Sequence, residues 1–265
     1  MSLTISELYI YPVKSCAGIA VQAAKLTRTG FEHDREWMLV REGGWFVTQR
    51  QYPRMALIQP RVSADGLVLN APDMPEIIIP ILTGGGAKTL EVRVWDDLMT
   101  GADQGDEASA WLSKFLDAPV RLVRQEGERP LGNKYQVTGK DNVSFADSFP
   151  LLLVSQASLD DLNSRMDKLV PITRFRPNIV VAGGTAFQED DWRKLQVGGI
   201  TLHLPKQCSR CEIITIDQKT AIKDIEPMET LSSYRYKTKG IIFGKNTVAE
   251  QLKTLHVGDA IDVVE

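Results

Sequence analysis

Alternating apolar and polar residues dominate the first third of the chain. Short runs rich in β-branched and aromatic residues follow one another, and turn-forming residues such as Glu42-Gly43-Gly44 and Asp65-Gly66 separate them. Such runs predict strands joined by hairpins. We expect strands at 3–11, 36–41, 45–50, 55–63, 66–69, 76–82 and 90–95, with a further turn at 84–86. The first ~95 residues therefore predict a β-barrel or sandwich.

Helical periodicity appears in the segment 105–119. Trp111, Leu112, Phe115 and Leu116 fall on one face, and Pro119 cannot continue the helix.

A second helix is expected after a buried strand at 151–154. Ser158, with Asp161 three residues later, resembles a capping box and marks the start of this helix. Pro171 ends it. Its apolar stripe consists of Leu159, Leu162, Met166 and Leu169.

The rest of the chain again favours strands. We expect them at 179–182, 195–197, 200–204, 212–217, 241–243 and 260–264, with a polar surface loop at 124–146 near a domain junction. The sequence therefore predicts a mainly β fold with a few helices (α+β), in two closely joined parts.

Composition narrows the function classes. The chain has 265 residues and a formal net charge of −3, which argues against a binder of nucleic acid. No apolar run is long enough to span a bilayer, and the N-terminus lacks the features of an export signal. Three cysteines cannot build a disulfide framework. We therefore expect a cytoplasmic protein with no membrane partner.

Two of the three cysteines, Cys208 and Cys211, lie close together. A closed zinc site needs four ligands, and this pair supplies only two, since His203 is expected to face solvent. A thioredoxin-like disulfide needs a helix after the first cysteine, whereas β-branched residues here favour a strand. A built-in iron–sulfur cluster needs four thiolates, and the chain has three cysteines.

A single active thiolate is the remaining chemical hypothesis. Arg210 beside Cys211 would favour the thiolate form. One sulfur holds a metal tightly only if an organic cofactor already chelates that metal. The alternative is a buried, inert cysteine pair.

Several separated motifs resemble the MOSC-domain proteins. They are YPVKSCAG at 11–18, GFEHDREWMLV at 30–40, FADSFPLLLVSQASLDDLN at 145–163, RFRPNIVVAGG at 174–184 and QCSRCEIITIDQKT at 207–220. Together they are similar to the branch that contains the amidoxime-reducing components. This resemblance implies an N-terminal β-barrel domain at 1–100 and a MOSC β-barrel domain at 101–265.

The resemblance also implies a molybdenum cofactor, in which molybdopterin holds the metal and one cysteine completes its sulfur ligands. That cysteine is Cys211, and Cys208 is a neighbour. Asp147 corresponds to a catalytic position near the metal. The expected cofactor-binding residues are Lys14, Ser15, Arg35, Ser148, Arg176, Asn178, Ser209 and Arg210. Clustered cations and hydroxyls suit a phosphate dianion. A contact from Asn246 is doubtful, because some members have tyrosine there.

The activity implied by the family is reduction of N-hydroxylated compounds: hydroxylamines, amidoximes and N-hydroxylated nucleobases. We expect electrons from a separate ferredoxin- or flavin-type reductase. One alternative is a carrier of the cofactor or of sulfur, with a persulfide on Cys211; a family-level association with pyridoxal phosphate belongs to this context. A second alternative is a binding module without catalysis.

Overall fold

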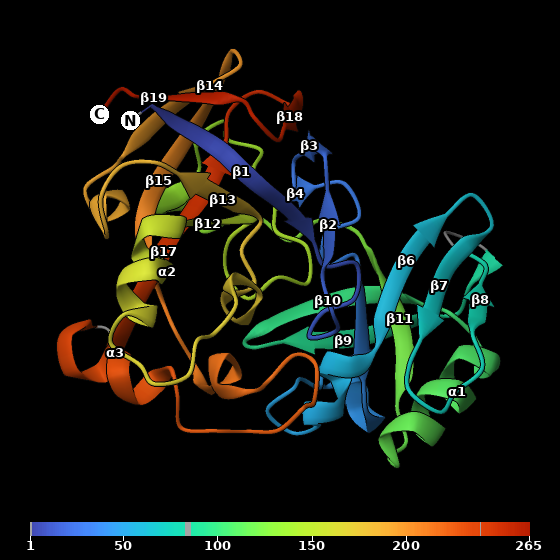
Figure 1. Cartoon of the computed structure of the whole chain (residues 1–265). Helices are drawn as coiled ribbons and strands as arrows, with labels where there is room; N and C mark the ends of the chain where they lie inside the picture. The colour runs from blue at the N-terminus through green and yellow to red at the C-terminus, as the bar shows by residue number, and fades with distance from the viewer. Residues whose placement is uncertain (1, 83–85, 239) are drawn as a thin grey trace.

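The structure, a computed structural model, describes residues 2–82, 86–238 and 240–265. Its largest feature is a closed barrel of seven strands (Figure 1). The ring runs β12 (Leu151–Ser155), β13 (Ile179–Ala182), β1 (Leu3–Ile10), β19 (Ala260–Val263), β14 (Lys194–Val197), β15 (Ile200–Ser209) and β17 (Gly240–Ala249), and β17 pairs back with β12. Only the β12–β13 pair in this ring is parallel, among the described residues. The predicted mainly β fold is confirmed.

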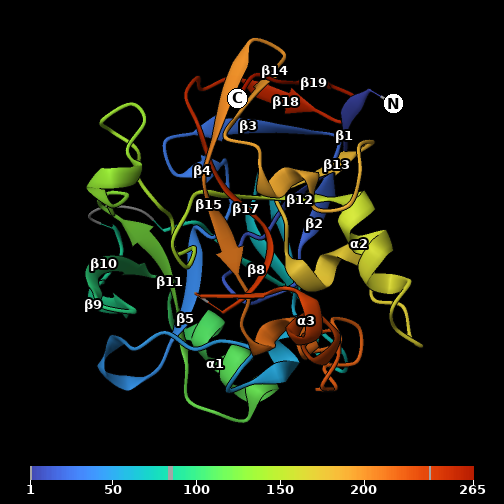
Figure 2. The ribbon, with the colours of Figure 1, turned by 90° about the vertical axis from the view of Figure 1, so that its left-hand side faces the viewer.

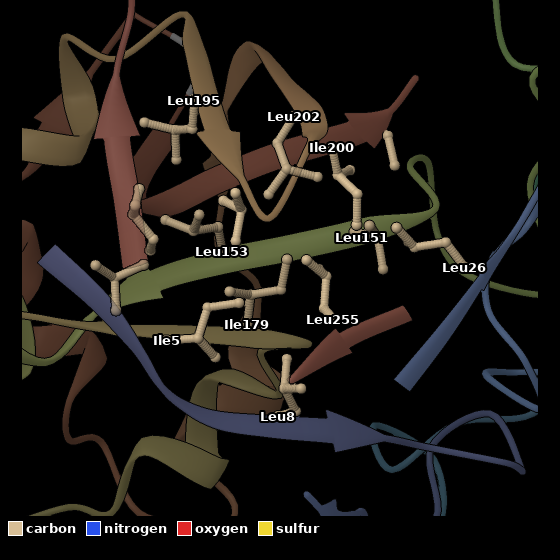
Figure 3. Packing of buried hydrophobic residues seen from close by; sticks show 14 of the residues in the cluster. Ile5, Leu8, Leu26, Leu151, Leu153, Ile179, Leu195, Ile200, Leu202 and Leu255 are labelled. Carbon is tan, nitrogen blue, oxygen red and sulfur yellow. The ribbon is translucent and has the colours of Figure 1, made fainter. Parts of the chain in front are cut away.

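Branched apolar side chains fill the inside of this barrel (Figure 3). Alternation along β15 buries Ile200, Leu202 and Leu204, while the residues between them are partly exposed. This pattern is the period of two that a half-buried strand requires. Leu153 and Ile179 come from the neighbouring strands β12 and β13 and are fully buried. The barrel interior is therefore a packed core, and the site must lie outside it.

The second part of the molecule consists of two sheets and a helix. One sheet has the order β5 (Trp37–Val40), β11 (Arg121–Glu126), β10 (Asp97–Asp103), β9 (Thr89–Val94). The other has the order β6 (Gln59–Ser63), β7 (Gly66–Asn70), β8 (Ile77–Ile79). Helix α1 (Asp106–Leu116) buries Trp111, Leu112, Phe115 and Leu116 against them, which confirms the predicted face. Its last residue is followed by Asp117 in a left-handed conformation.

Shorter elements surround the barrel. A small sheet joins β18 (Thr254–His256), β3 (Ala23–Thr27) and β4 (Gly30–Phe31), while β2 (Ile19–Val21) pairs with β1 and β16 (Tyr236–Lys237) with β17. Helices α2 (Gln156–Asn163) and α3 (Met228–Tyr234) lie on the side of the barrel away from β9 and β10 (Figure 2). Single turns of 3-10 helix lie at Glu42–Gly44, Pro53–Leu57, Asn133–Tyr135, Ile172–Phe175, Gln188–Asp190 and Glu212–Thr215.

The predicted second helix differs at both ends. It starts after Ser155, and Ser158 lies inside it, buried, donating its hydroxyl to Glu189 at 2.6 Å. The capping-box prediction is therefore wrong, because a tertiary hydrogen bond uses the serine. The helix ends at Asn163, so Leu169 does not join the stripe and is 70% exposed.

The strand predicted at 212–217 is also wrong. Residues Glu212–Thr215 form a 3-10 turn, and Cys211 is its N-cap. Ile213 and Ile214 are buried, so tertiary packing outweighs their β propensity.

Other predicted boundaries shift. The segment 45–50 has only isolated bridges at Trp45 and Phe46, and 55–63 begins as a 3-10 turn. The expected loop 124–146 starts inside β11. The turn expected at 84–86 falls largely on 83–85, outside the described residues. The domain boundary near residue 100 stays a prediction.

Candidate functional site

The residues expected to form the site come from both parts of the chain and line one cavity, here called the arginine cavity. Its lining includes every predicted site residue: Lys14, Ser15, Arg35, Asp147, Ser148, Arg176, Asn178, Ser209, Arg210 and Cys211. Cys208, Phe149 and Asn246 line it as well. The cavity holds about 160 Å³, which is small for a ligand site. Its lining residues lie far apart in the sequence, from Lys14 to Asn246, so only the tertiary fold brings them together.

Three of these residues have left-handed backbone that normally favours glycine. Ser15 has φ +65°, Arg35 φ +53° and Arg176 φ +54°. Ser15 lies third in a turn closed by the Cys16 N–H donating to the Val13 carbonyl at 3.0 Å. Arg176 ends the 3-10 turn Ile172–Phe175. Such strain costs about 1–3 kcal/mol per residue and concentrates at functional sites.

Lys14 is buried and forms an ion pair across the cavity. Its Nζ lies 2.5 Å from Asp147 Oδ1 and donates to the Phe145 carbonyl at 2.7 Å. Burial raises the pKa of Asp147, but the Lys14 charge, its hydrogen bond and the Arg50 charge together bring that pKa to about 2. Asp147 is therefore ionised at neutral pH, with its side chain half exposed.

Arg35 is held by a network on the barrel side. Its Nη1 donates to Asp34 Oδ2 at 2.5 Å and to Asn178 Oδ1 at 3.0 Å. Its Nη2 donates to the Arg176 carbonyl at 3.2 Å. Asn178 Nδ2 donates to the Tyr9 carbonyl at 3.1 Å. The amide of Asn178 thus orients Arg35, besides lining the cavity.

Arg176 and Arg210 differ from Arg35 because neither pairs with a carboxylate in the described part of the chain. Arg176 Nη1 donates to the Cys16 carbonyl at 2.7 Å, and Arg210 Nη2 to the Phe175 carbonyl at 2.7 Å. Arg176 Nη2 and Arg210 Nε are buried without a hydrogen bond among the described residues. Burial, with the nearby Arg35 charge, lowers the pKa of Arg176 to about 10. Both guanidinium groups are therefore suited to receive an anion.

The two cysteines occupy different positions. Arg210 Nη1 lies 3.0 Å from Cys208 Sγ, so the guanidinium that we expected beside Cys211 contacts Cys208. Cys211 follows β15 and caps the 3-10 turn Glu212–Thr215. Both thiols line the arginine cavity, but only Cys211 also lines a second, adjoining cavity.

Sequence analysis missed the second cavity, here called the tryptophan cavity. It is wider, at about 600 Å³, and shares Asp147, Ser148, Phe149, Ser209 and Cys211 with the arginine cavity. Its other lining residues include Arg50, Trp95, Asp96, Arg129, Tyr135 and Lys206. The one signal in the sequence was a tryptophan at the turn between two strand-like runs.

Arg129 lines the tryptophan cavity and joins two of the segments around it. It is buried, and its side chain donates to Asp97 Oδ2 at 2.7 Å and to the carbonyls of Ser144 at 3.1 Å and Ala146 at 2.6 Å. The hairpin that carries Asp97 and the segment that carries Asp147 are therefore fixed to each other.

The fold and the site thus define a class of protein. It is a two-part, mostly β protein in which an arginine-lined cavity ends at an accessible cysteine. Comparisons with known proteins agree with this class. The model of the MOSC N-terminal beta barrel domain matches residues 2–119, and that of the MOSC domain matches residues 140–262.

Curated relatives match almost the whole chain. Mitochondrial amidoxime reducing component 2 of Bos taurus is 39% identical, over 97% of this chain and 82% of the relative. Mitochondrial amidoxime-reducing component 1 of Homo sapiens is 37% identical, over the same two shares. Component 2 of Homo sapiens is also 37% identical, over 97% and 82%. The chain therefore belongs to the family of MOSC-domain proteins that includes the amidoxime-reducing components.

The expectation of a cytoplasmic protein is wrong, because these relatives are mitochondrial components. In the described ranges, we find no helix with the length and apolar character needed to cross a membrane.

Proposed function

We propose that this protein is a molybdenum-cofactor-dependent reductase of N-hydroxylated compounds, with Cys211 as the protein ligand to the metal. Hydroxylamines, amidoximes and N-hydroxylated nucleobases are the expected substrates. In the overall reaction an amidoxime, two electrons and two protons give an amidine and one water. The N–O bond breaks, and the oxygen leaves as water. The family membership supports reduction at nitrogen in general.

The residues of the arginine cavity fit an anionic pterin cofactor. The orphaned N–H groups of Arg176 and Arg210 are the observation that tests this fit, because buried donors without partners suit phosphate oxygens. Lys14 and Arg35 already pair with Asp147 and Asp34, so the two unpaired arginines would carry most of the phosphate binding. When bound, the cofactor supplies a redox centre that accepts the oxygen atom and exchanges two electrons.

The chain's own side chains would bind and orient the cofactor and the substrate. Cys211 supplies the thiolate, and its place at the junction of both cavities leaves the tryptophan cavity for substrate. Ser148 and Ser209 are exposed beside it and offer hydroxyl groups to either molecule. Asp147, ionised and paired with Lys14, has no proton to donate at neutral pH, and its low pKa makes it a weak proton acceptor. Its proposed role is thus to hold Lys14 and the loop in place.

Electrons must reach the metal from another protein. We propose a separate donor of the ferredoxin or flavin reductase type. It would dock where the tryptophan cavity opens, since that cavity leads from the surface to Cys211.

The position of Cys211 between the two cavities is the single observation that carries this function. The test is metal analysis of the purified protein, followed by reduction of a panel of N-hydroxylated compounds with an artificial electron donor. Stoichiometric molybdenum with turnover supports the reductase. Sulfane sulfur on Cys211 without molybdenum supports the carrier instead. Finding neither molybdenum nor sulfane sulfur refutes the reductase and favours a binding module without catalysis.

A further inference from the structure

The tip of the β9–β10 hairpin carries an unusual residue. Trp95 and Asp96 form the two-residue loop between the strands Thr89–Val94 and Asp97–Asp103. Trp95 has φ +56°, while Asp96 does not have positive φ. A positive φ at only the first position of such a loop favours glycine. The largest side chain thus stands where the backbone prefers none.

Core packing does not explain this tryptophan, since Trp95 is 43% exposed. The indole is nevertheless fixed in place. The Arg50 guanidinium lies 4.7 Å from its ring centre, and the Phe46 ring meets it edge-on at 5.1 Å. The indole N–H donates to Asp147 Oδ1 at 3.4 Å. A strained, exposed and oriented aromatic ring is typical of a binding surface.

The rest of the tryptophan cavity adds apolar walls and positive charge. Tyr135 and Phe149 form an aromatic pair with centroids 4.9 Å apart. Arg50 and Lys206 pair with no carboxylate in the described residues, whereas Arg129 is neutralised by Asp97. With Lys14 counted beside its partner Asp147, four cations (Lys14, Arg50, Arg129 and Lys206) face three carboxylates (Asp96, Asp97 and Asp147), so one positive charge remains in excess. Such a lining suits a planar ring that carries an anion.

Shared lining residues link this surface to the proposed chemistry. Asp147 contacts the indole N–H and lines both cavities, and Cys211 lines both as well. A compound that lies on Trp95 therefore extends toward the Cys211 sulfur.

We propose that the tryptophan cavity is the substrate subsite and that Trp95 and Arg50 determine its specificity, favouring planar N-hydroxylated compounds with a carboxylate or phosphate group. This inference rests on the proposed function and names the substrate class for it. Trp95 supplies the platform, and Arg50, with Lys206, selects the anion.

The test compares binding of benzamidoxime and 4-carboxybenzamidoxime to the purified holoprotein by calorimetry. No electron donor is present, so neither compound is turned over. We expect the wild type to bind the carboxylate compound about tenfold more tightly, and Arg50→Gln to abolish this preference. Trp95→Gly should weaken the binding of both compounds about tenfold, while the melting temperature of the protein stays the same or rises.

Arg93→Gln is the matched control, because Arg93 lies on β9 over Trp45 and lines neither cavity. It should bind both compounds as the wild type does. Equal wild-type affinity for the two compounds, or unchanged binding in Arg50→Gln and Trp95→Gly, would overturn the proposal. Adding an electron donor then tests the proposed function separately: binding with no reduction refutes the reductase, whereas reduction with unaffected variants refutes only the subsite. Trp95→Phe keeps a ring at this position and gives a second variant if Trp95→Gly does not fold.

Discussion

The arginine cavity and the tryptophan cavity meet at one cysteine but differ in how they are built. The first is narrow and lined by buried cations, of which Lys14 and Arg35 are paired and Arg176 and Arg210 are not. The second is wider, aromatic and open to solvent. Both include strained backbone, at Arg176 in the first and Trp95 in the second. The difference supports the proposal that the first holds an anionic cofactor permanently, while the second admits substrates that bind and leave.

The largest expected effect lies where the cavities meet. Cys211→Ala should lower reductase activity more than about a hundredfold, beyond what loss of an outer-shell partner costs. Cys208→Ala should keep most activity, because Cys208 lines only the arginine cavity and contacts Arg210. Steady-state rates at matched protein concentration decide this. Equal losses in the two variants would mean that the thiols act as a pair.

Arg129→Gln should lower the stability of the protein by releasing the hairpin that carries Asp97 from the 144–147 segment. The change removes the ion pair with Asp97 and leaves buried carbonyls of Ser144 and Ala146 without their donor. We expect a loss of about 2–3 kcal/mol in the free energy of unfolding. Urea denaturation measures it. A loss near zero would show that the hairpin and the 144–147 segment hold their places independently.

Arg176→Gln should lower cofactor occupancy without unfolding the protein. One charged donor set to an anion is worth about tenfold or more in affinity. Molybdenum per protein chain is the readout. Arg165→Gln is the control, since Arg165 pairs with Asp161 at the surface, packs on the Tyr234 ring and lines neither cavity. Full occupancy in Arg176→Gln would remove this arginine from the phosphate site.

The smallest effect is a pH dependence at Asp147. Its folded pKa of about 2 lies below the ordinary 3.8, so the Lys14 pair stabilises the fold above about pH 4. This contribution is lost as the pH falls from about 4 to about 2. Because the Asp147 side chain is 52% exposed, we expect less than about 1 kcal/mol. Unfolding free energies of the wild type and Asp147→Asn should differ at pH 7 and converge below about pH 2; a constant difference contradicts the pair.

Sequence reasoning reached the arginine cavity but not the tryptophan cavity, for a physical reason. Short motifs contain Lys14, Ser15, Arg176 and Asn178, and the fold brings these motifs to one place. Arg50 and Trp95 stand in no motif, and only tertiary packing places them beside Cys211. A tryptophan in a two-residue turn was the signal that local reasoning could have used.

Local propensity also misjudged the residues after Cys211. The isoleucines at 213 and 214 predict a strand, yet they lie buried within the 3-10 turn Glu212–Thr215, so tertiary packing decides the backbone. Similarly, Ser158 has the spacing of a cap, but a buried hydrogen bond to Glu189 engages it. Core strands such as Ile179–Ala182 were predicted correctly, because β-branched propensity and continuous burial agree there.

The central claim is that the Cys211 sulfur is the protein ligand to molybdenum. X-ray absorption at the molybdenum edge of purified holoprotein measures the sulfur atoms bound to the metal. We expect Cys211→Ser to lose one metal-bound sulfur and Cys208→Ser to lose none. An unchanged sulfur count in Cys211→Ser, or the same loss in Cys208→Ser, would contradict the assignment.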